Sequence, residues 1–208
     1  MKINALLVLS CNGVNSSPPS SSTETNPIIL ANACDVSQFR FYEKTSAREF
    51  IVFVGRTVAK RTSPGQRQSV QQEEYKVHSY NRNGLCALGF TDDHYPVRSA
   101  FSLLNKVLDE YEKDFGDSWK TAQADATQPW PYLTEALTKF QDPAEADQLL
   151  KIQRELDETK ILLHKTIDSV LERGEKLDSL VEKSKDLTAA SHYFYNRAKN
   201  TNQCCTIL

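Results

Sequence analysis

The placement of proline and glycine divides this chain of 208 residues into two unequal parts. The last proline is Pro143, and the only later glycine is Gly174. Proline removes a backbone donor and breaks helices, and glycine weakens them. The segment after Pro143 is therefore predicted to form one long helix. Before Pro143 the apolar patterns alternate, which indicates a globular domain.

The first part predicts a small α+β domain with a mainly antiparallel sheet. Four β-rich runs predict strands, over residues 3–10, 28–33, 74–80 and 85–91. Asn83-Gly84 accepts the positive φ angles of a tight turn and should join the last two strands in a hairpin. The Ser- and Pro-rich stretch 15–26 is expected to be a flexible loop at the tip of the first hairpin.

Helices are predicted to flank this sheet. Ser46 and Glu49 have capping-box spacing ahead of an apolar stripe that begins at Phe50. A second helix should open at Pro96, and a third should run from Pro131 to Phe140.

Composition excludes several classes of partner. The 25 basic and 27 acidic residues give a net charge of −2 without a Lys/Arg block, so nucleic acid is not expected to bind. No apolar run reaches the roughly 20 residues that span a bilayer. The apolar run after Lys2 has features of a secretion signal, but its shortness favours a strand. The five cysteines form no C-x-x-C pair, which indicates a reducing compartment and no metal site.

A heptad seam runs through the second part, at alternating steps of three and four. Its apolar members are Leu149, Ile152, Leu156, Leu163, Val170, Leu177, Leu180, Leu187, Phe194 and Ala198, and Thr159, Thr166, Ser184 and Ser191 occupy positions between them. Arg173 occupies the seam itself, where an unpaired charge costs several kcal/mol. Its guanidinium offers five donors, so the seam is predicted to join a larger bundle whose partners supply acceptors. The simpler alternatives are a helix docked on the first domain and a homodimeric coiled coil.

The chain ends in a prenylation signal, Cys205-Thr206-Ile207-Leu208. The terminal leucine favours a geranylgeranyl group by the general rule. One lipid chain binds membranes only marginally, so a second signal is expected. Cys204 is the candidate, as a palmitoyl or second prenyl site.

The runs 156–161 and 171–178 are similar to the R-SNARE motif, and Arg173 matches its central ionic layer. Residues 1–140 resemble a longin domain, a profilin-like fold with an antiparallel sheet and flanking helices, notably over 39–42 and 95–98. Residues 144–203 would then be the SNARE coiled-coil helix, and 204–208 the lipidation signal. The whole chain thus resembles the lipid-anchored longin-domain R-SNAREs, which are synaptobrevin homologues.

This resemblance implies a protein of vesicle docking and membrane fusion in intracellular transport, including transport between ER and Golgi. Its helix would form a four-helix bundle with three glutamine-bearing Q-SNARE helices, without catalysis, cofactor, metal or small-molecule substrate. A prenyltransferase would modify Cys205, usually with farnesyl in this family, and a methyl ester would follow cleavage. The protein would be cytoplasmic and peripheral on Golgi, ER, endosomal or vacuolar membranes. The longin domain would be autoinhibitory, with Phe39, Phe41 and Tyr42 receiving the helix and lipid, unless these aromatics belong to the core.

Three rival functions are weaker. A prenylated GTPase would need a G-x-x-x-x-G-K-[ST] loop, which the sequence lacks. A cysteine hydrolase would use Cys86 with His78 or His94, but no signature surrounds them. A prenylated trafficking adaptor or tether without fusion activity explains the lipid signal but not Arg173 in the seam.

Overall fold

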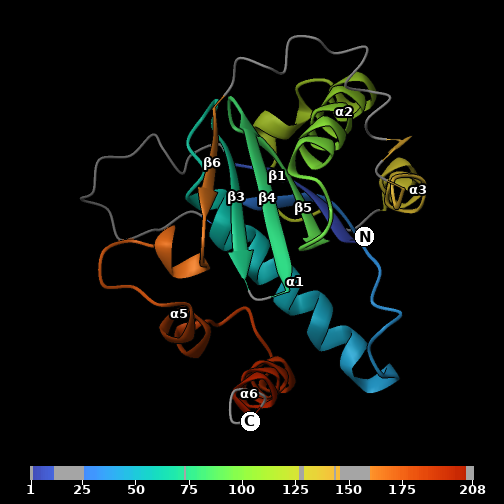
Figure 1. The fold of residues 1–208 in the computed structure, drawn as a ribbon. Helices are drawn as coiled ribbons and strands as arrows, with labels where there is room; N and C mark the ends of the chain where they lie inside the picture. The colour runs from blue at the N-terminus through green and yellow to red at the C-terminus, as the bar shows by residue number, and fades with distance from the viewer. Residues whose placement is uncertain are drawn as a thin grey trace.

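The fold is built on a mixed sheet whose strands follow the order β2-β1-β5-β4-β3-β6 (Figure 1). The computed structural model describes residues 2–11, 26–72, 74–126, 129–142, 144–145 and 160–204, with the side chains of 200–204 left aside. The strands are β1 (Ile3–Ser10), β2 (Ile28–Cys34), β3 (Arg67–Gln72), β4 (Tyr75–Arg82), β5 (Leu85–Asp92) and β6 (Ile161–His164).

Strand β1 lies between β2 and β5, and all eight of its residues are buried. Its apolar side chains face both ways, since Leu6 and Val8 belong to one half of the core and Leu7 and Leu9 to the other. Burial on both faces explains why this run is continuously apolar. The N-terminal run is therefore a core strand, as its length predicted.

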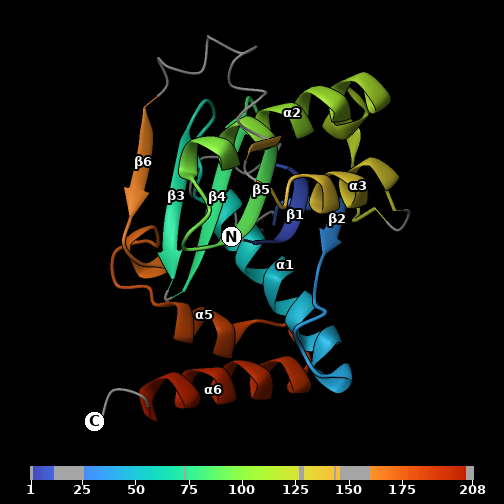
Figure 2. The same ribbon diagram turned by 45° about the vertical axis from the view of Figure 1, so that its right-hand side comes forward.

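Helices cover both faces of the sheet (Figure 2). On one face lies α1 (Lys44–Lys60), and on the other lie α2 (Val97–Phe115) and α3 (Pro131–Lys139). The hairpin at Asn83-Gly84 is confirmed, because both residues have positive φ angles of 52° and 104°. Strand β3 was not predicted, since its sequence Arg-Gln-Ser-Val-Gln-Gln is mostly polar.

The predicted capping box at the start of the first helix is wrong. Helix α1 already begins at Lys44 after the short 3-10 helix η1 (Phe41–Glu43), so Ser46 lies inside its first turn and is buried. Glu49 is therefore left free to bind another element.

The continuous helix predicted over 144–203 is also wrong for the residues that the structure describes there. Residues 160–204, here called the C-terminal segment, form β6, the 3-10 helix η4 (Ile167–Ser169), α5 (Leu177–Lys183) and α6 (Ala189–Cys204). Strand β6 pairs in parallel with β3, so the sheet is mixed and not purely antiparallel. A lone heptad helix would expose its seam to water, whereas this arrangement buries part of it.

Among the residues that the structure describes, every helix is too short or too polar to cross a bilayer.

Candidate functional site

The seam residues of the C-terminal segment are split between the core and the surface. Leu177 and Leu187 are buried, and Val170, Leu180 and Phe194 are half-buried. Leu163 is 71% exposed on β6, and Ala198 and Arg173 are exposed. Leu149, Ile152 and Leu156 lie outside the described residues. The seam is thus not one continuous face here, and part of it packs on the first domain.

Apolar packing is the main force that holds the segment. Ile167, Leu177, Val181 and Leu187 share a core cluster with Val54 and Val58 of α1 and with Val77 of β4. Full burial of such a side chain contributes about 1.5–3 kcal/mol. Exposed ion pairs contribute about 0–1 kcal/mol each, so the free energy of docking comes mostly from these four side chains.

Glu49 caps the N-terminus of α6 from the neighbouring helix α1. Its Oε2 accepts hydrogen bonds from the Thr188 backbone N–H at 3.3 Å, the Thr188 hydroxyl at 2.8 Å and the Ser191 hydroxyl at 2.6 Å. Burial alone would raise the pKa of Glu49, but the bonds from Ser191 and Thr188 outweigh it and lower that pKa. The negative carboxylate also interacts favourably with the positive end of the α6 dipole.

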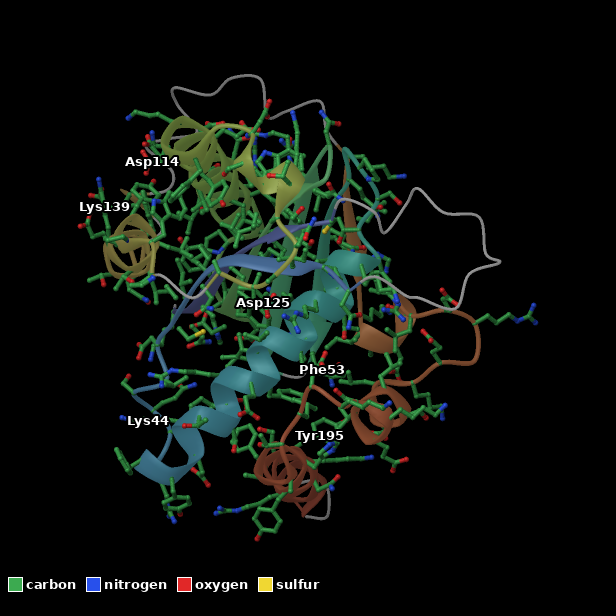
Figure 3. The ribbon with its side chains drawn as sticks, turned by 180° about the vertical axis from the view of Figure 1, so that it is seen from behind. Lys44, Phe53, Asp114, Asp125, Lys139 and Tyr195 are labelled. Atoms are coloured by element: carbon green, nitrogen blue, oxygen red, sulfur yellow. The ribbon has the colours of Figure 1, made fainter. Side chains whose placement is uncertain are left out.

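Further polar contacts join α6 to its surroundings. Arg197 Nη1 donates to Glu43 Oε1 at 2.7 Å, and Lys199 Nζ donates to Asp178 Oδ2 at 2.6 Å. The Tyr195 hydroxyl also donates to Asp178, and its ring lies 5.2 Å from that of Phe50. Figure 3 shows Tyr195 on α6 below Phe53 of α1. These contacts fix the orientation of α6 across α1.

Arg173 and Gly174 form an exposed turn ahead of α5, and Gly174 has a φ of 91°. The turn is fixed by Glu175, whose Oε2 accepts from Arg61 Nη2 at 2.6 Å and from the Glu172 backbone N–H at 3.2 Å. A hydrogen bond from Arg61 lowers the pKa of Glu175. The seam arginine therefore lies at the surface, next to a turn that a helix would not contain.

The three aromatics predicted to receive the segment differ in their contacts. The rings of Phe39 and Phe194 meet edge to face at 5.6 Å. Phe41 is 90% exposed and Tyr42 is 64% exposed, so neither belongs to the core. Arg40 donates to the Tyr42 hydroxyl at 2.9 Å and lowers the pKa of that phenol.

The residues of the hydrolase alternative have other partners. His78 Nε2 lies 3.0 Å from the Thr91 hydroxyl, and burial lowers the pKa of His78 to about 3. Cys86 Sγ lies 3.4 Å from the Ser79 hydroxyl, and burial raises the pKa of its thiol. His94 pairs with the neighbouring Asp93 on the surface. A neutral imidazole and a protonated thiol, both buried, do not make a nucleophilic pair.

The predicted lipidation sites lie at the end of the described chain and just beyond it. Helix α6 ends at Cys204, and Cys205 lies outside the described residues. The sequence did not indicate the contacts of Glu49, Asp178 or Tyr195. The usable signal for the start of α6 was Thr188 followed by Ser191, because a threonine just before a helix and a serine in its first turn are typical of a capped N-terminus.

Comparison with known proteins covers both parts of the chain. Residues 36–130 match the family model Longin, described as a regulated-SNARE-like domain, and residues 148–206 match the model Synaptobrevin. The chain is 72% identical to VAMP-like protein YKT61 of Arabidopsis thaliana over the full length of both. It is 66% identical to VAMP-like protein YKT62 of the same plant, again over both whole chains. It is 48% identical to Synaptobrevin homolog YKT6 of Saccharomyces cerevisiae over 86% of this chain and 91% of the relative.

Proposed function

Because this chain belongs to the family of longin-domain R-SNAREs of vesicle trafficking, we propose that its residues 144–203 supply one helix of a fusion-driving four-helix bundle. It interacts with other SNARE proteins and is not an enzyme. In this proposal residues 1–140 are the longin domain and 204–208 the lipidation signal. Three Q-SNARE helices would complete the bundle, with Arg173 facing their glutamines.

The observation that carries the proposal is the position of Arg173. It lies in the heptad seam by sequence, yet it is exposed on a turn and has no structural role in the core. A bundle would surround its guanidinium with side-chain carbonyl acceptors, which repay the desolvation of a buried charge. A helix that only docks on its own domain gains nothing from an arginine there.

Mixing the protein with matched and mismatched Q-SNARE helices, followed by detection of detergent-resistant complexes, tests this proposal. Arg173→Leu should lose the preference for three-glutamine partners while the first domain stays folded, because Arg173 is exposed. Lys183→Leu, an exposed α5 residue outside the seam, is the matched control. An unchanged preference in Arg173→Leu, or no complex with any Q-SNARE set, would instead favour a tether without fusion activity.

The lipid anchor belongs to the same proposal. A prenyltransferase would modify Cys205, and Cys204 would carry a palmitoyl or second prenyl group, since one chain alone binds marginally. Attachment would then be reversible and would place the protein on the cytosolic face of Golgi, ER, endosomal or vacuolar membranes.

The folded-back C-terminal segment supports an autoinhibited state. Bundle formation needs Leu177 and Leu187 in the seam, but both are buried against the first domain. Their release costs the apolar docking free energy, which the Q-SNARE helices would have to supply. In this proposal Phe39 receives α6, and Phe41 and Tyr42 beside it receive the lipid.

A further inference from the structure

Three aromatic side chains project into solvent at one end of the molecule, and they are here called the aromatic rim. They are Phe41, Tyr42 and Tyr193, with exposures of 90%, 64% and 70%. A phenylalanine this exposed gains nothing for folding, because its apolar area stays in water. Packing within the domain therefore does not explain why Phe41 is exposed.

Contacts between residues 39–43 and α6 bring the members of the rim to the same side. Phe194 meets Phe39, and Arg197 binds Glu43. Tyr193 lies one helical turn before Arg197 and so shares its side of α6. Tyr42 and Phe41 directly precede Glu43 in η1. The exposed rings thus flank one junction between α6 and the start of α1.

The same end of the molecule is positively charged. Residues 39–49 contain Arg40, Lys44 and Arg48 against Glu43 and Glu49, a net charge of +1. Residues 189–199 contain Arg197 and Lys199 and no acid, a net charge of +2 with histidine neutral. The two segments together carry +3, whereas the whole chain carries −2. Asp178 offsets one of these charges through Lys199.

The last described residues of the chain also lie on this side. Figures 1 and 2 both show α6 and the N-terminal tip of α1 along the lower edge of the molecule, with the sheet and α2 above them. In Figure 3, Lys44 and Tyr195 lie at this end, and Asp114 and Lys139 lie at the other. Cys204 is the last residue of α6 and Cys205 follows it in the sequence, so a bilayer holding lipid on these cysteines is close to this edge.

We propose that the aromatic rim and the basic residues around it form a docking surface for a bilayer rich in anionic phospholipid. Aromatic side chains partition into the interfacial region of membranes, and lysine and arginine beside them attract anionic headgroups. The surface orients the folded-back protein with α6 along the bilayer. The surface adds a protein–lipid contact that is independent of the covalent lipid. Once that lipid has left Phe41 and Tyr42 and inserted into the membrane, the surface is free to contact the bilayer.

Vesicle co-sedimentation of the full chain tests this surface, with Cys204→Ser and Cys205→Ser introduced so that no covalent lipid contributes. Phosphatidylcholine vesicles with and without phosphatidylserine are the probes. The protein should bind the phosphatidylserine vesicles preferentially. Phe41→Ser should lower the partition coefficient about tenfold, because the variant has no aromatic ring to transfer from water to the membrane interface. Lys44→Gln should lower it about fivefold, the effect of one charge near an anionic surface.

Matched controls lie at the opposite end on α2. Phe115 is 43% exposed and Lys113 is exposed, so Phe115→Ser and Lys113→Gln should bind like the parent. Because Phe41 is almost wholly in water, its substitution leaves the fold intact, and the melting temperature checks this. Equal binding to both vesicle types overturns the proposal. So does parental binding by Phe41→Ser or Lys44→Gln, or an equal loss in the α2 controls.

Discussion

Gly174 must adopt two backbone conformations if the chain both folds back and joins a bundle. In the folded-back segment its φ is 91°, and a Cβ there would meet no atom within 4 Å. An alanine there would destabilise the turn only through its left-handed backbone conformation, by roughly 1 kcal/mol. In a helix the same alanine gains about 1 kcal/mol over glycine. The glycine therefore favours the turn on both counts.

Gly174→Ala should shift the equilibrium toward the helical form by roughly 2 kcal/mol, about 30-fold. Helix content by circular dichroism and the rate of assembly with Q-SNARE helices should both rise. Gly65→Ala is the matched control, because Gly65 also has a positive φ of 78° and open space around it but lies between α1 and β3. An increase in assembly rate for Gly65→Ala as large as that for Gly174→Ala would contradict this role.

Cys205→Ser should remove prenylation and, with it, modification of Cys204, because the prenylated terminus is the first membrane signal. The variant should leave the membrane fraction of cell lysates, and mass spectrometry of the C-terminal peptide should show two unmodified positions. Cys34→Ser changes a half-buried cysteine of β2 and should keep the lipid. Unmodified Cys205 in membrane-bound wild-type protein would refute the anchor.

At the scale of elements, the sequence predicted what local chemistry decides. The Asn83-Gly84 hairpin, the apolar strand β1 and the helix after Pro131 formed as expected. Strand β3 was missed because its buried side chains are mostly polar and bind other elements: Gln68 donates to the Thr62 hydroxyl, and Arg67 stacks on Tyr80 of β4. Strand β6, Ile161–His164, lies inside a heptad pattern, and only the free edge of β3 makes it a strand. The helical period was compatible with a bundle, but it could not show what the chain does without partners.

The cap that α1 provides for α6 makes the docking of α6 sensitive to acid. The pKa of Glu49 is lowered in the folded-back state from its ordinary value of 4.5. The ionised carboxylate therefore stabilises the folded-back state fully at pH values above 4.5. This contribution is lost as the pH falls from 4.5 through the lowered pKa. The protection of α6 amides against hydrogen exchange should thus be constant from neutral pH down to about 5 and fall below about 4.5.

Glu49→Gln should reduce this pH dependence of α6 protection, because no ionisable group then remains at the cap, and leave the part that comes from Asp178, which binds Lys199 of α6. It should also weaken docking by about 1 kcal/mol, the usual contribution of an N-cap. Glu135→Gln, an exposed residue of α3, should retain the wild-type profile. If Glu49→Gln shows an unchanged acid transition, the transition comes from Asp178 or Glu175 and not from Glu49. The pKa values of these two groups are lowered by Lys199 and Arg61 respectively.

At the scale of the whole molecule, the folded-back state and the proposed bundle would compete for the same apolar surface. The folded-back state covers Leu177 and Leu187, and the bundle would cover them with other helices. Docking therefore has to be strong enough to hide the seam and weak enough for Q-SNAREs to displace it. The contact between Phe39 and Phe194 lies at the margin of this docked surface, where a change loosens α6 without touching the core of the first domain.

Phe39→Glu should open the molecule. It removes an edge-to-face pair, worth about 0.5–1.5 kcal/mol beyond its buried area, and places a carboxylate near Glu43, the partner of Arg197. Small-angle scattering should show a larger radius of gyration, with the melting temperature of the first domain unchanged. Tyr42→Glu should act in the same direction but more weakly, because Tyr42 is mostly exposed. Tyr75→Glu, on the exposed side of β4, should leave the radius unchanged. A wild-type radius in both Phe39→Glu and Tyr42→Glu would mean that α6 docks through Glu49 and the apolar cluster alone, and that these aromatics do not control opening.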